Sequence, residues 1–484
     1  MPDFAADTVT FILDEYLRRR AAMLKKTLLD QMIKFTKKDK VRMHMPGHNG
    51  GAGLSSKFKK YAFSVDVTEF DETDNLQEPQ SILLNSEKWL ADVFGARRSY
   101  MLTNGSTIGL IAAILGAAKP GDKLIVDRNC HKAVVSAMVL GGIVPVFVEP
   151  EFNNDFGIYA QITPLSIMDA ARENPDAAGA VITSPTYYGV CSDIEKLAYQ
   201  LHMVKKFLIV DEAHGAHFAF SSELPKTALE QGADVAVQSA HKTLPALGQT
   251  ALLHIGDTEY IDHVGIERSL RLLQTTSPSY MLLTSIDDAV ESMLGGMGKR
   301  LDMNIAQVIE LKTRIGVKDK ISCLNGGYLK LPQDTLRLVV NFEKLGITGY
   351  GAAELLRSEH GIYPEMADPK NVVFYITAST TSKEISILSS ALDAISDAEY
   401  EREYAEKSRR LPKIEMGYTM KEAYNSKYTY LDISHAEGRI CADIISHCPP
   451  GAVIAAPGQI ITKEVISYIK DFTDITSIKV VDNR

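Results

Sequence analysis

The sequence predicts an α/β protein built on a mostly parallel sheet with helices on both faces. Short apolar runs rich in valine, isoleucine and leucine alternate with helical patterns, at residues 123–127, 144–148, 179–183, 207–211, 234–238 and 250–254. This alternation is typical of parallel sheets, whose strands are buried on both faces. Polar residues also follow several of the runs where each strand ends, and ligands bind open α/β sheets at that edge.

The composition is that of an ordinary globular protein with more than one domain. The chain has 484 residues, of which 45% are hydrophobic and 23% charged, and its formal net charge is −9. This acidic balance argues against nucleic acid or an anionic membrane as the main partner. No apolar run reaches the roughly 18 residues of a membrane span, and the N-terminus lacks a signal-peptide core, so we expect a cytoplasmic protein. The five cysteines form no CxxC pair and fit a reducing compartment.

The changes of pattern along the chain predict four parts. Apolar residues recur at helical spacing over residues 7–34, and a second α/β pattern begins near residue 297. The expected parts are an N-terminal helical segment at 1–40, a large domain at 41–296, a smaller α/β domain at 297–410 and a C-terminal domain at 411–484. In the smaller domain we expect strands at 336–341 and 372–377 and helices at 350–359 and 383–396.

A loop rich in proline and glycine occupies residues 42–51. It contains His44 and His48, but the Pro46-Gly47 pair between them excludes a helix that would present both to a metal ion. We therefore expect no metal site and interpret this segment as a loop at the border of an active site, with His44 facing substrate. The acidic stretch at 64–78 is interpreted as a solvated loop, with an entrance for a basic substrate as the alternative.

The segment around Gly105-Ser106-Thr107 predicts a phosphate site. It follows a helix expected at 80–94 and a strand at 99–102, and it opens an apolar helix that runs to about residue 118. The free N–H groups and the dipole of a helix start attract an anion. This is no Walker A loop, because Gly-Lys-Ser/Thr is absent. The alternative is that Ser106 or Thr107 only caps the helix.

Polar residues at three strand ends predict the chemistry of the site. They are the segments Asn129–His131, Ser184–Tyr188 and Asp211–His214. The last spells a helicase signature, but that class needs a phosphate loop upstream and none is present. In a pyridoxal phosphate (PLP) enzyme, Asp211 would keep the pyridine nitrogen protonated and His131 could stack on the ring. His214 and His217 are candidates for proton transfer, with a structural role as the alternative for His217.

The segment Ser239-Ala240-His241-Lys242 lies between two apolar runs and is the centre of the PLP hypothesis. A lysine amine can form a Schiff base with the aldehyde of PLP, while Ser239 and His241 hold the phosphate. A surface lysine at a turn is the alternative, which the polar strand ends disfavour. Helices expected over 256–316 are interrupted at 274–280 by a hydroxyl-rich segment that could complete the phosphate site across a dimer interface.

In this order, the motifs resemble the shorter bacterial form of the Orn/Lys/Arg decarboxylase family. The matching segments are His44–His48, Asn104–Thr107, Asn129–Lys132, Thr183–Gly189, Asp211–His217, Ser239–Leu247, Thr275–Pro278 and Pro449–Gly451. The resemblance implies the aspartate-aminotransferase fold (PLP fold type I), with a large domain, a smaller α/β domain and a C-terminal extension. It also implies a homodimer with shared active sites, sometimes assembled further, that acts on a basic amino acid.

The resemblance implies a role for each matching residue. Lys242 would carry PLP, Asp211 would pair with the pyridine nitrogen, and His131 would stack on the ring beside His214. The phosphate would be held by hydroxyls and one imidazole, including a hydroxyl from the neighbouring subunit. These residues are Ser106, Thr107, Ser239 and His241, with Thr276 or Ser277 arriving from that subunit.

Two residues depart from the family pattern. Gln459 stands where the pattern has a glutamate that is expected to meet the substrate's distal cationic group, and Asn49 stands where a lysine is more common. An amide keeps its hydrogen bonding but loses the charge, and a charge-assisted bond contributes about 1.5–3 kcal/mol against about 1 kcal/mol for a neutral one. Gln459 is therefore kept as a candidate substrate residue, with lower expected affinity for a basic side chain.

The predicted function is PLP-dependent α-decarboxylation of a basic amino acid, with arginine favoured over lysine or ornithine. Lys242 or His214 would return a proton to Cα. One alternative keeps the cofactor and is an oxidase, hydroxylase or aminotransferase acting on arginine or a related amino acid, which the change at Gln459 motivates. The other is a non-catalytic regulatory protein with the same fold, against which the full set of cofactor residues argues.

Overall fold

The computed structural model of the chain describes residues 27–38, 41–318, 320–325, 332–401, 410–446 and 451–482. Most of the N-terminal helical segment expected at 1–40 lies outside these ranges, and its described part is α2 (Leu28–Thr36). Within the described ranges, no helix combines the length and the apolar character needed to span a membrane. The same ranges hold no cluster of three or more His, Cys, Asp or Glu residues suited to a metal ion.

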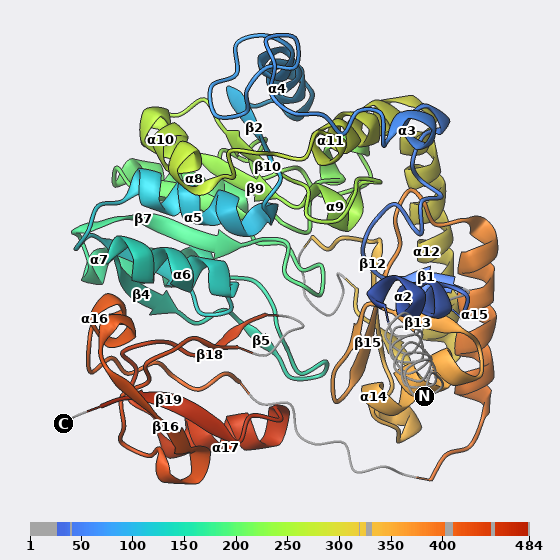
Figure 1. Cartoon of the computed structure of the whole chain (residues 1–484). Coiled ribbons are helices and arrows are strands. Elements are labelled where there is room, and N and C mark those ends of the chain that lie inside the picture. The colour runs from blue at the N-terminus through green and yellow to red at the C-terminus, as the bar shows by residue number, and fades with distance from the viewer. Residues whose placement is uncertain are drawn as a thin grey trace, which may run out of the picture.

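A seven-stranded sheet forms the centre of the large domain (Figure 1). Its strands, in spatial order, are β2 (Arg98–Leu102), β10 (Ala251–Ile255), β9 (Val235–Gln238), β8 (Phe207–Asp211), β7 (Ala177–Thr183), β3 (Lys123–Asp127) and β4 (Val144–Val148). Strand β10 is antiparallel to both of its neighbours, whereas the other adjacent pairs are parallel. The mostly parallel sheet predicted from the sequence is confirmed.

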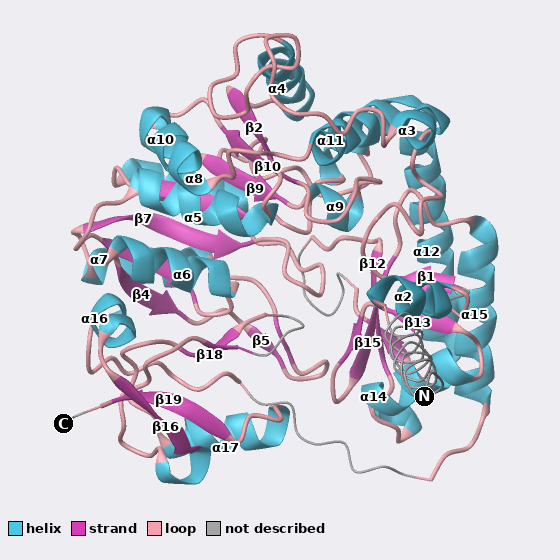
Figure 2. Ribbon diagram, viewed as in Figure 1, coloured by secondary structure: helices cyan, strands magenta, loops and turns pink. Residues whose placement is uncertain are grey.

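Helices cover both faces of this sheet (Figure 2). Alternate residues of β8 belong to different cores: Ile209 packs with one set of helices, and Leu208 and Val210 pack with the other. The first set is α5 (Gly105–Ala117), α6 (Lys132–Gly141) and α10 (His263–Leu273), and the second is α7 (Pro164–Glu173) and α8 (Ile194–Met203). Burial on both faces explains why the strand sequences are apolar throughout rather than alternating.

Further helices connect the large domain to the smaller one. They are α3 (Ser56–Tyr61), α4 (Ile82–Phe94), α9 (Ala240–Thr243), α11 (Tyr280–Ser292) and α12 (Gly298–Lys318). Local signals define the ends of several helices. Thr163 caps α7, and Pro164 is its first residue. Proline suits this position because the N–H groups of the first turn have no partner within the helix, so the N–H that proline lacks is not missed there. Gly95 ends α4 with a φ of 63°, a left-handed conformation that glycine adopts without strain.

The smaller domain is an antiparallel sheet packed against helices. Its strands, in order, are β11 (Ser322–Cys323), β12 (Arg337–Asn341), β15 (Asn371–Tyr375) and β14 (Met366–Ala367), and its helices are α14 (Gly349–Ser358) and α15 (Ser382–Asp397). The two strands and two helices expected here are confirmed, with ends shifted by one or two residues. In addition, β1 (Val41–Met43) pairs in parallel with β13 (Ile362–Pro364), so the start of the expected large domain joins the smaller one.

The C-terminal unit has its own small core. It contains β16 (Tyr428–Asp432) paired with β19 (Ser477–Val481), β17 (Ile445–Ser446) paired with β18 (Val453–Ala455), and helices α16 (Met420–Asn425) and α17 (Lys463–Phe472). A hairpin of the large domain, β5 (Phe152–Asn153) and β6 (Ile158–Tyr159), contributes Tyr159 to this core. The unit therefore packs directly against the large domain at the edge of the sheet where β3 ends.

Candidate active site

The strand ends bring the predicted site residues to one edge of the central sheet. Four parallel strands contribute. Asn104 and Ser106 follow β2, and His131 follows β3. Asp211 is the last residue of β8 and His214 follows it, while Lys242 follows β9. Because parallel strands point the same way, residues after each strand gather although they are far apart in sequence. The cluster contacts the other two units, since His214 meets Tyr375 and Arg337 of the smaller domain and His131 forms a backbone bridge to Ala452 of the C-terminal unit.

Lys242 is held on the short helix α9 and faces His214. Its Nζ lies 3.1 Å from His214 Nε2. The loop that contains His44 packs against the same helix, since the N–H of Gly47 donates to the carbonyl of His241 over 2.7 Å. A Cβ at Gly47 would lie 2.5 Å from the Leu244 carbonyl oxygen, so only glycine allows this approach.

The other nitrogen of His214 faces two side chains of the smaller domain. The Tyr375 hydroxyl is hydrogen-bonded to Nδ1, and a guanidinium nitrogen of Arg337 lies 3.5 Å from the same atom. A guanidinium can only donate, so we assign Nδ1 as the acceptor and place the ring proton on Nε2. That proton points at Lys242 Nζ, and the arrangement therefore favours the neutral amine, which is the nucleophilic form.

The electrostatics of this cluster keep His214 neutral. Burial lowers the pKa of His214 well below its ordinary value; a protonated Lys242 would lower it further, and so does the positive charge of Arg337. Arg337 is itself almost fully buried, and its guanidinium carbon lies 3.0 Å from the centre of the Tyr375 ring. Its Nε has no hydrogen-bond partner in the described chain. The site thus contains a buried cation whose field acts directly on the imidazole.

Asp211 and His131 form the other side of the cluster. Asp211 is buried at the end of β8, and its Oδ1 accepts from the N–H of Ala213 at 3.2 Å. Burial raises the pKa of Asp211, while the nearby His131 and Lys242 oppose that rise. His131 caps helix α6, with its Nδ1 accepting from the Ala133 N–H at 3.2 Å. A buried carboxylate at this position can pair with the protonated ring nitrogen of a pyridine, because its negative charge stabilises the positive charge of that nitrogen.

The proposed phosphate position is the start of helix α5. Its N-cap residue Asn104 makes no side-chain capping bond, so the first N–H groups of the helix have no side-chain acceptor there. Ser106 accepts at its Oγ from the Ser239 hydroxyl at 2.8 Å, and Gly105 has a φ of 75° that lets the chain turn into the helix. His241 donates from Nδ1 to the Thr250 carbonyl at 2.8 Å, and burial lowers its pKa to about 4. These donors fit a phosphate group.

The remaining predicted residues face solvent or contact groups outside this cluster. Thr107, Thr276 and Ser277 are exposed, the last two on the connection between α10 and α11. His44 is half-buried, with its Nδ1 2.6 Å from the Met45 carbonyl oxygen. His217 is buried and pairs with Asp334 of the smaller domain at 3.2 Å, an arrangement that joins the two domains.

Gln459 has no exposed surface with which to meet a substrate. Its side-chain carbonyl accepts from the Ala456 N–H at 3.1 Å, and its amide donates to the Lys413 carbonyl at 3.2 Å. A neutral amide can satisfy a backbone donor and a backbone acceptor at once, which a glutamate cannot do. In this conformation the side chain holds the C-terminal unit together, which differs from the substrate contact expected from the sequence.

Arg337 and Tyr375 are the two site residues that sequence reasoning missed. Both lie on strands of the smaller domain, β12 and β15, where they pair with each other across the sheet. The available signal was an arginine at the start of an otherwise apolar strand, because a buried charge in such a run needs a partner or a function. Nothing local in the sequence connects that arginine to His214.

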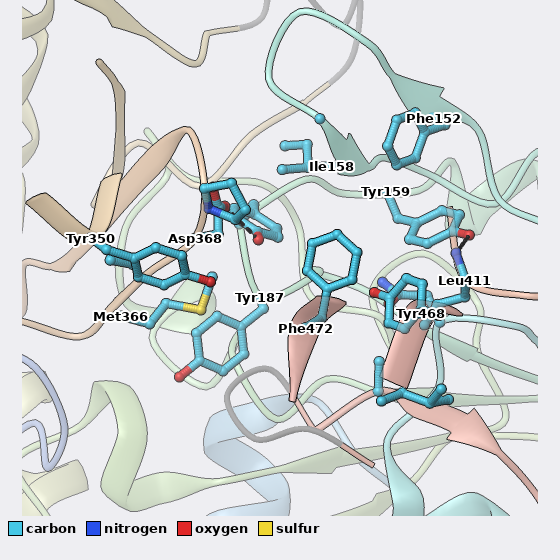
Figure 3. A pocket seen from close by; sticks show the side chains of 17 residues that line it. Phe152, Ile158, Tyr159, Tyr187, Tyr350, Met366, Asp368, Leu411, Tyr468 and Phe472 are labelled. Carbon is cyan, nitrogen blue, oxygen red and sulfur yellow. Dashed lines mark hydrogen bonds between the residues drawn. The ribbon is translucent and has the colours of Figure 1, made fainter. Parts of the chain in front are cut away.

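A cavity of about 130 Å³ adjoins the cluster (Figure 3). Tyr187, one of its lining residues, packs edge-on against the His214 ring with 4.9 Å between ring centres. Ala452 also lines it and is paired with His131 through a backbone bridge. The cavity and the Lys242 cluster therefore share walls.

The similarities to known proteins agree with this geometry. The family described as Orn/Lys/Arg decarboxylase, major domain, matches residues 26–331. A Bacillus subtilis protein named arginine decarboxylase is 32% identical over 448 residues, which cover 90% of this chain and 91% of that one.

Two solved structures show the fold. The lysine decarboxylase of Francisella novicida has a TM-score of 0.72 at 18% identity, covering 94% of this chain and 84% of that one. The ureidoglycine-glyoxylate aminotransferase of Bacillus subtilis has a TM-score of 0.56 at 13% identity, covering 73% of this chain and 92% of that one. The predicted PLP fold type I is thereby confirmed. On the family match and the relative together, the chain belongs to the Orn/Lys/Arg decarboxylase family, the PLP-dependent decarboxylases of basic amino acids.

Proposed function

We propose that this chain decarboxylates arginine, with PLP attached to Lys242. The observation that carries the proposal is the Lys242 amine, 3.1 Å from a neutral His214 and close to the buried Asp211. Arginine is favoured over lysine and ornithine because the similar protein of Bacillus subtilis is named arginine decarboxylase, and the similarity covers 91% of that protein.

The chain's residues fit PLP in a definite way. When bound, PLP supplies an electron-withdrawing ring that accepts the electron pair left as CO2 departs. Asp211 would hold a proton on the pyridine nitrogen, and His131 would cover one face of the ring. The phosphate would bind at the start of α5, where the first N–H groups of the helix and the hydroxyls of Ser106 and Ser239 supply donors. The charge of a bound phosphate would favour a second proton on His241, at Nε2, which would then donate as well. Thr107 lies at the exposed side of this helix start.

Proton return to Cα is assigned to Lys242 and His214. His214 Nε2–H points at Lys242 Nζ, so the imidazole can replace a proton given up by the amine as Nδ1 takes the Tyr375 hydroxyl proton, which keeps the ring neutral. The hydrogen bond from Tyr375 at Nδ1 keeps the ring oriented while this transfer occurs. Arg337 disfavours a second proton on the ring, so His214 passes a proton on and does not retain it.

We further propose a cytoplasmic homodimer with shared active sites, open to larger assembly. Thr276 and Ser277 are exposed in the single chain, as residues that reach a neighbouring subunit would be. Their hydroxyls would complete the phosphate site of that subunit.

The test is product analysis by mass spectrometry after PLP-loaded protein is given equal arginine, lysine and ornithine. We expect agmatine, the amine that arginine leaves when it loses CO2. If the products are a ketone and ammonia and oxygen is consumed, the result would contradict decarboxylation and support the oxidase alternative. Lys242→Ala should lose both the absorbance of the lysine-bound cofactor and all turnover, and an active Lys242→Ala protein would refute the role of this lysine.

A further inference from the structure

The cavity beside the active site is enclosed by aromatic side chains from all three units of the chain (Figure 3). Phe152 and Tyr159 come from the β5–β6 hairpin, Tyr350 from α14, and Tyr468 and Phe472 from α17. In Figure 3 the α17 and hairpin rings face Tyr350, Met366 and Asp368 across the cavity. The opposing walls are therefore ring faces on one side and a mixture of ring, thioether and carboxylate on the other.

Asp368 is the one charged side chain among the lining residues of this cavity. Its Oδ2 accepts from the Tyr188 hydroxyl at 2.8 Å, and its Oδ1 accepts from the backbone N–H groups of Lys370 and Asn371 at 2.8 Å. The Asn371 side-chain amide also donates to both oxygens, at 3.0 and 2.9 Å, so within the described chain the carboxylate is hydrogen-bonded by neutral groups alone. Burial raises the pKa of Asp368, and no ion pair joins it to a described residue. The nearest lysine in sequence, Lys370, pairs instead with Glu343 at 2.9 Å. A buried carboxylate without an ion-pair partner attracts a cation that can approach it with good hydrogen-bond geometry.

The aromatic wall suits a guanidinium more than a compact ammonium. Guanidinium ions are planar and stack on aromatic faces, where the ring quadrupole attracts the charge. The chain itself already shows this contact, because the Arg410 guanidinium lies 5.2 Å from the centre of the Phe152 ring. Tyr159 and Tyr188 also carry carboxylate neighbours, Glu149 and Asp368, which make their environment more negative.

The size of the cavity limits the ligand. A cavity of about 150 Å³ holds a molecule the size of benzene. At about 130 Å³, this one has room for a guanidinium with a short part of its alkyl chain. The α-carbon of a ligand held in this way would lie on the side where Tyr187 and Ala452 border His214 and His131.

We propose that this cavity binds the distal guanidinium of the amino-acid substrate, between the rings of Tyr350 and Phe472 and beside Asp368. The inference rests on the proposed function and adds the residues that select the substrate. It also assigns to Asp368 the charge that Gln459 does not supply, since Gln459 is neutral and bonded to backbone groups.

The experiment measures binding with a ligand that cannot react at Lys242. Propylguanidine carries the distal group of arginine without its amine, and propylurea is its neutral isostere. Calorimetry on the PLP-loaded protein should give an affinity for propylguanidine about tenfold above that for propylurea, as expected of a charge-assisted contact. Equal affinities would overturn the proposal.

Two variants locate the site. Asp368→Asn should weaken propylguanidine about tenfold and leave propylurea unchanged, because only the charge is lost. Asp176→Asn removes the same charge from an exposed residue and should change neither affinity. Since Asp368 also accepts backbone N–H groups, Phe472→Leu is the second variant: it keeps an apolar side chain and should weaken propylguanidine about threefold through loss of the ring face.

The outcomes separate this inference from the proposed reaction. If arginine is not decarboxylated but propylguanidine binds with the expected pattern, the cavity assignment stands and the reaction falls. If arginine is decarboxylated while Asp368→Asn and Phe472→Leu change neither propylguanidine affinity nor KM for arginine, the cavity assignment falls and the reaction stands.

Discussion

At the scale of single residues, His214 has contacts with side chains of two domains. Its ring belongs to the large domain and faces Lys242, whereas the groups that orient it, Tyr375 and Arg337, belong to the smaller domain. The geometry of this candidate site therefore depends on side chains more than 120 residues apart in sequence, as the hydrogen bond between His214 and Arg337 shows.

Replacing Arg337 with methionine should raise the pKa of His214. The substitution keeps the buried volume and removes one of the positive charges that lower this pKa. The His214 pKa then moves up toward its ordinary value, and the acid limb of the pH–rate profile moves in the same direction. Titration of the His214 ring signals by NMR measures the change. Arg314→Met, at an exposed arginine that pairs with Asp393, should leave the His214 signals in place.

Glu87 supplies a pH dependence of stability that is independent of the active site. Burial raises its pKa to about 8 in the folded chain, from an ordinary value near 4.5. A group whose folded pKa is raised binds more protons in the folded state, so its contribution is fully present below about pH 4.5 and is lost as the pH rises toward about 8.

Replacing Glu87 with glutamine should remove that loss. The amide oxygen can still accept from the Met101 N–H, which Glu87 accepts at 3.2 Å. We expect the variant to gain about 3–5 kcal/mol relative to the natural chain at about pH 8 and almost nothing at about pH 4. Urea unfolding at both pH values measures the difference. An equal effect at both pH values would mean that Glu87 is ionised in the folded chain.

At the scale of elements, helix α15 ties the active-site loop to the smaller domain. Thr381 and Glu384 form a capping box at its start. Glu384 also accepts at its Oε1 from the Asn49 amide at 3.1 Å. Asn49 has a φ of 46°, a left-handed conformation that asparagine tolerates better than lysine does. Asn49, in place of the lysine expected from the family pattern, therefore suits a left-handed turn and links the loop at residues 44–51 to helix α15 through Glu384.

The two residues of this capping box should behave differently when replaced. Thr381→Ala removes the cap alone and should cost about 1 kcal/mol of stability without changing KM. Glu384→Ala removes both the cap and the tether to the loop at residues 44–51, so it should cost a similar amount and also raise KM. Urea unfolding and steady-state kinetics distinguish them. If both variants leave KM unchanged, the tether has no role in the site.

At the scale of the whole molecule, Arg128 fastens the C-terminal unit to the central sheet. It is buried directly after β3 and donates to the carbonyls of Val453, Pro412 and Ile454, at 2.5, 2.9 and 3.1 Å. These acceptors are backbone groups on two separate segments. A single arginine therefore holds the unit whose α17 and β18 form part of the guanidinium cavity.

Arg128→Met should loosen this unit more than it destabilises the sheet. Unpaired buried carbonyls cost about 1–3 kcal/mol each, so we expect a loss of several kcal/mol concentrated at the interface. Limited proteolysis should then cleave the connection before residue 410 faster than in the natural chain. Arg172→Met, at an exposed arginine paired with Asp169, serves as the control. Unchanged cleavage in Arg128→Met would show that apolar packing alone holds the unit.

The sequence by itself determined the parallel sheet, the position of its strands and the polar residues at their ends. These features depend on apolar runs, helix caps and turns that act over a few residues, so they are readable locally. Lys242, Asp211 and His131 were predicted for that reason, since each follows a recognisable strand. The tertiary structure decided how Arg337 and Tyr375 meet His214, how β1 pairs with β13 and where Gln459 is buried. Those contacts join segments that are far apart in the sequence. The local pattern of one segment does not predict its partner, because these contacts form only when whole domains pack together.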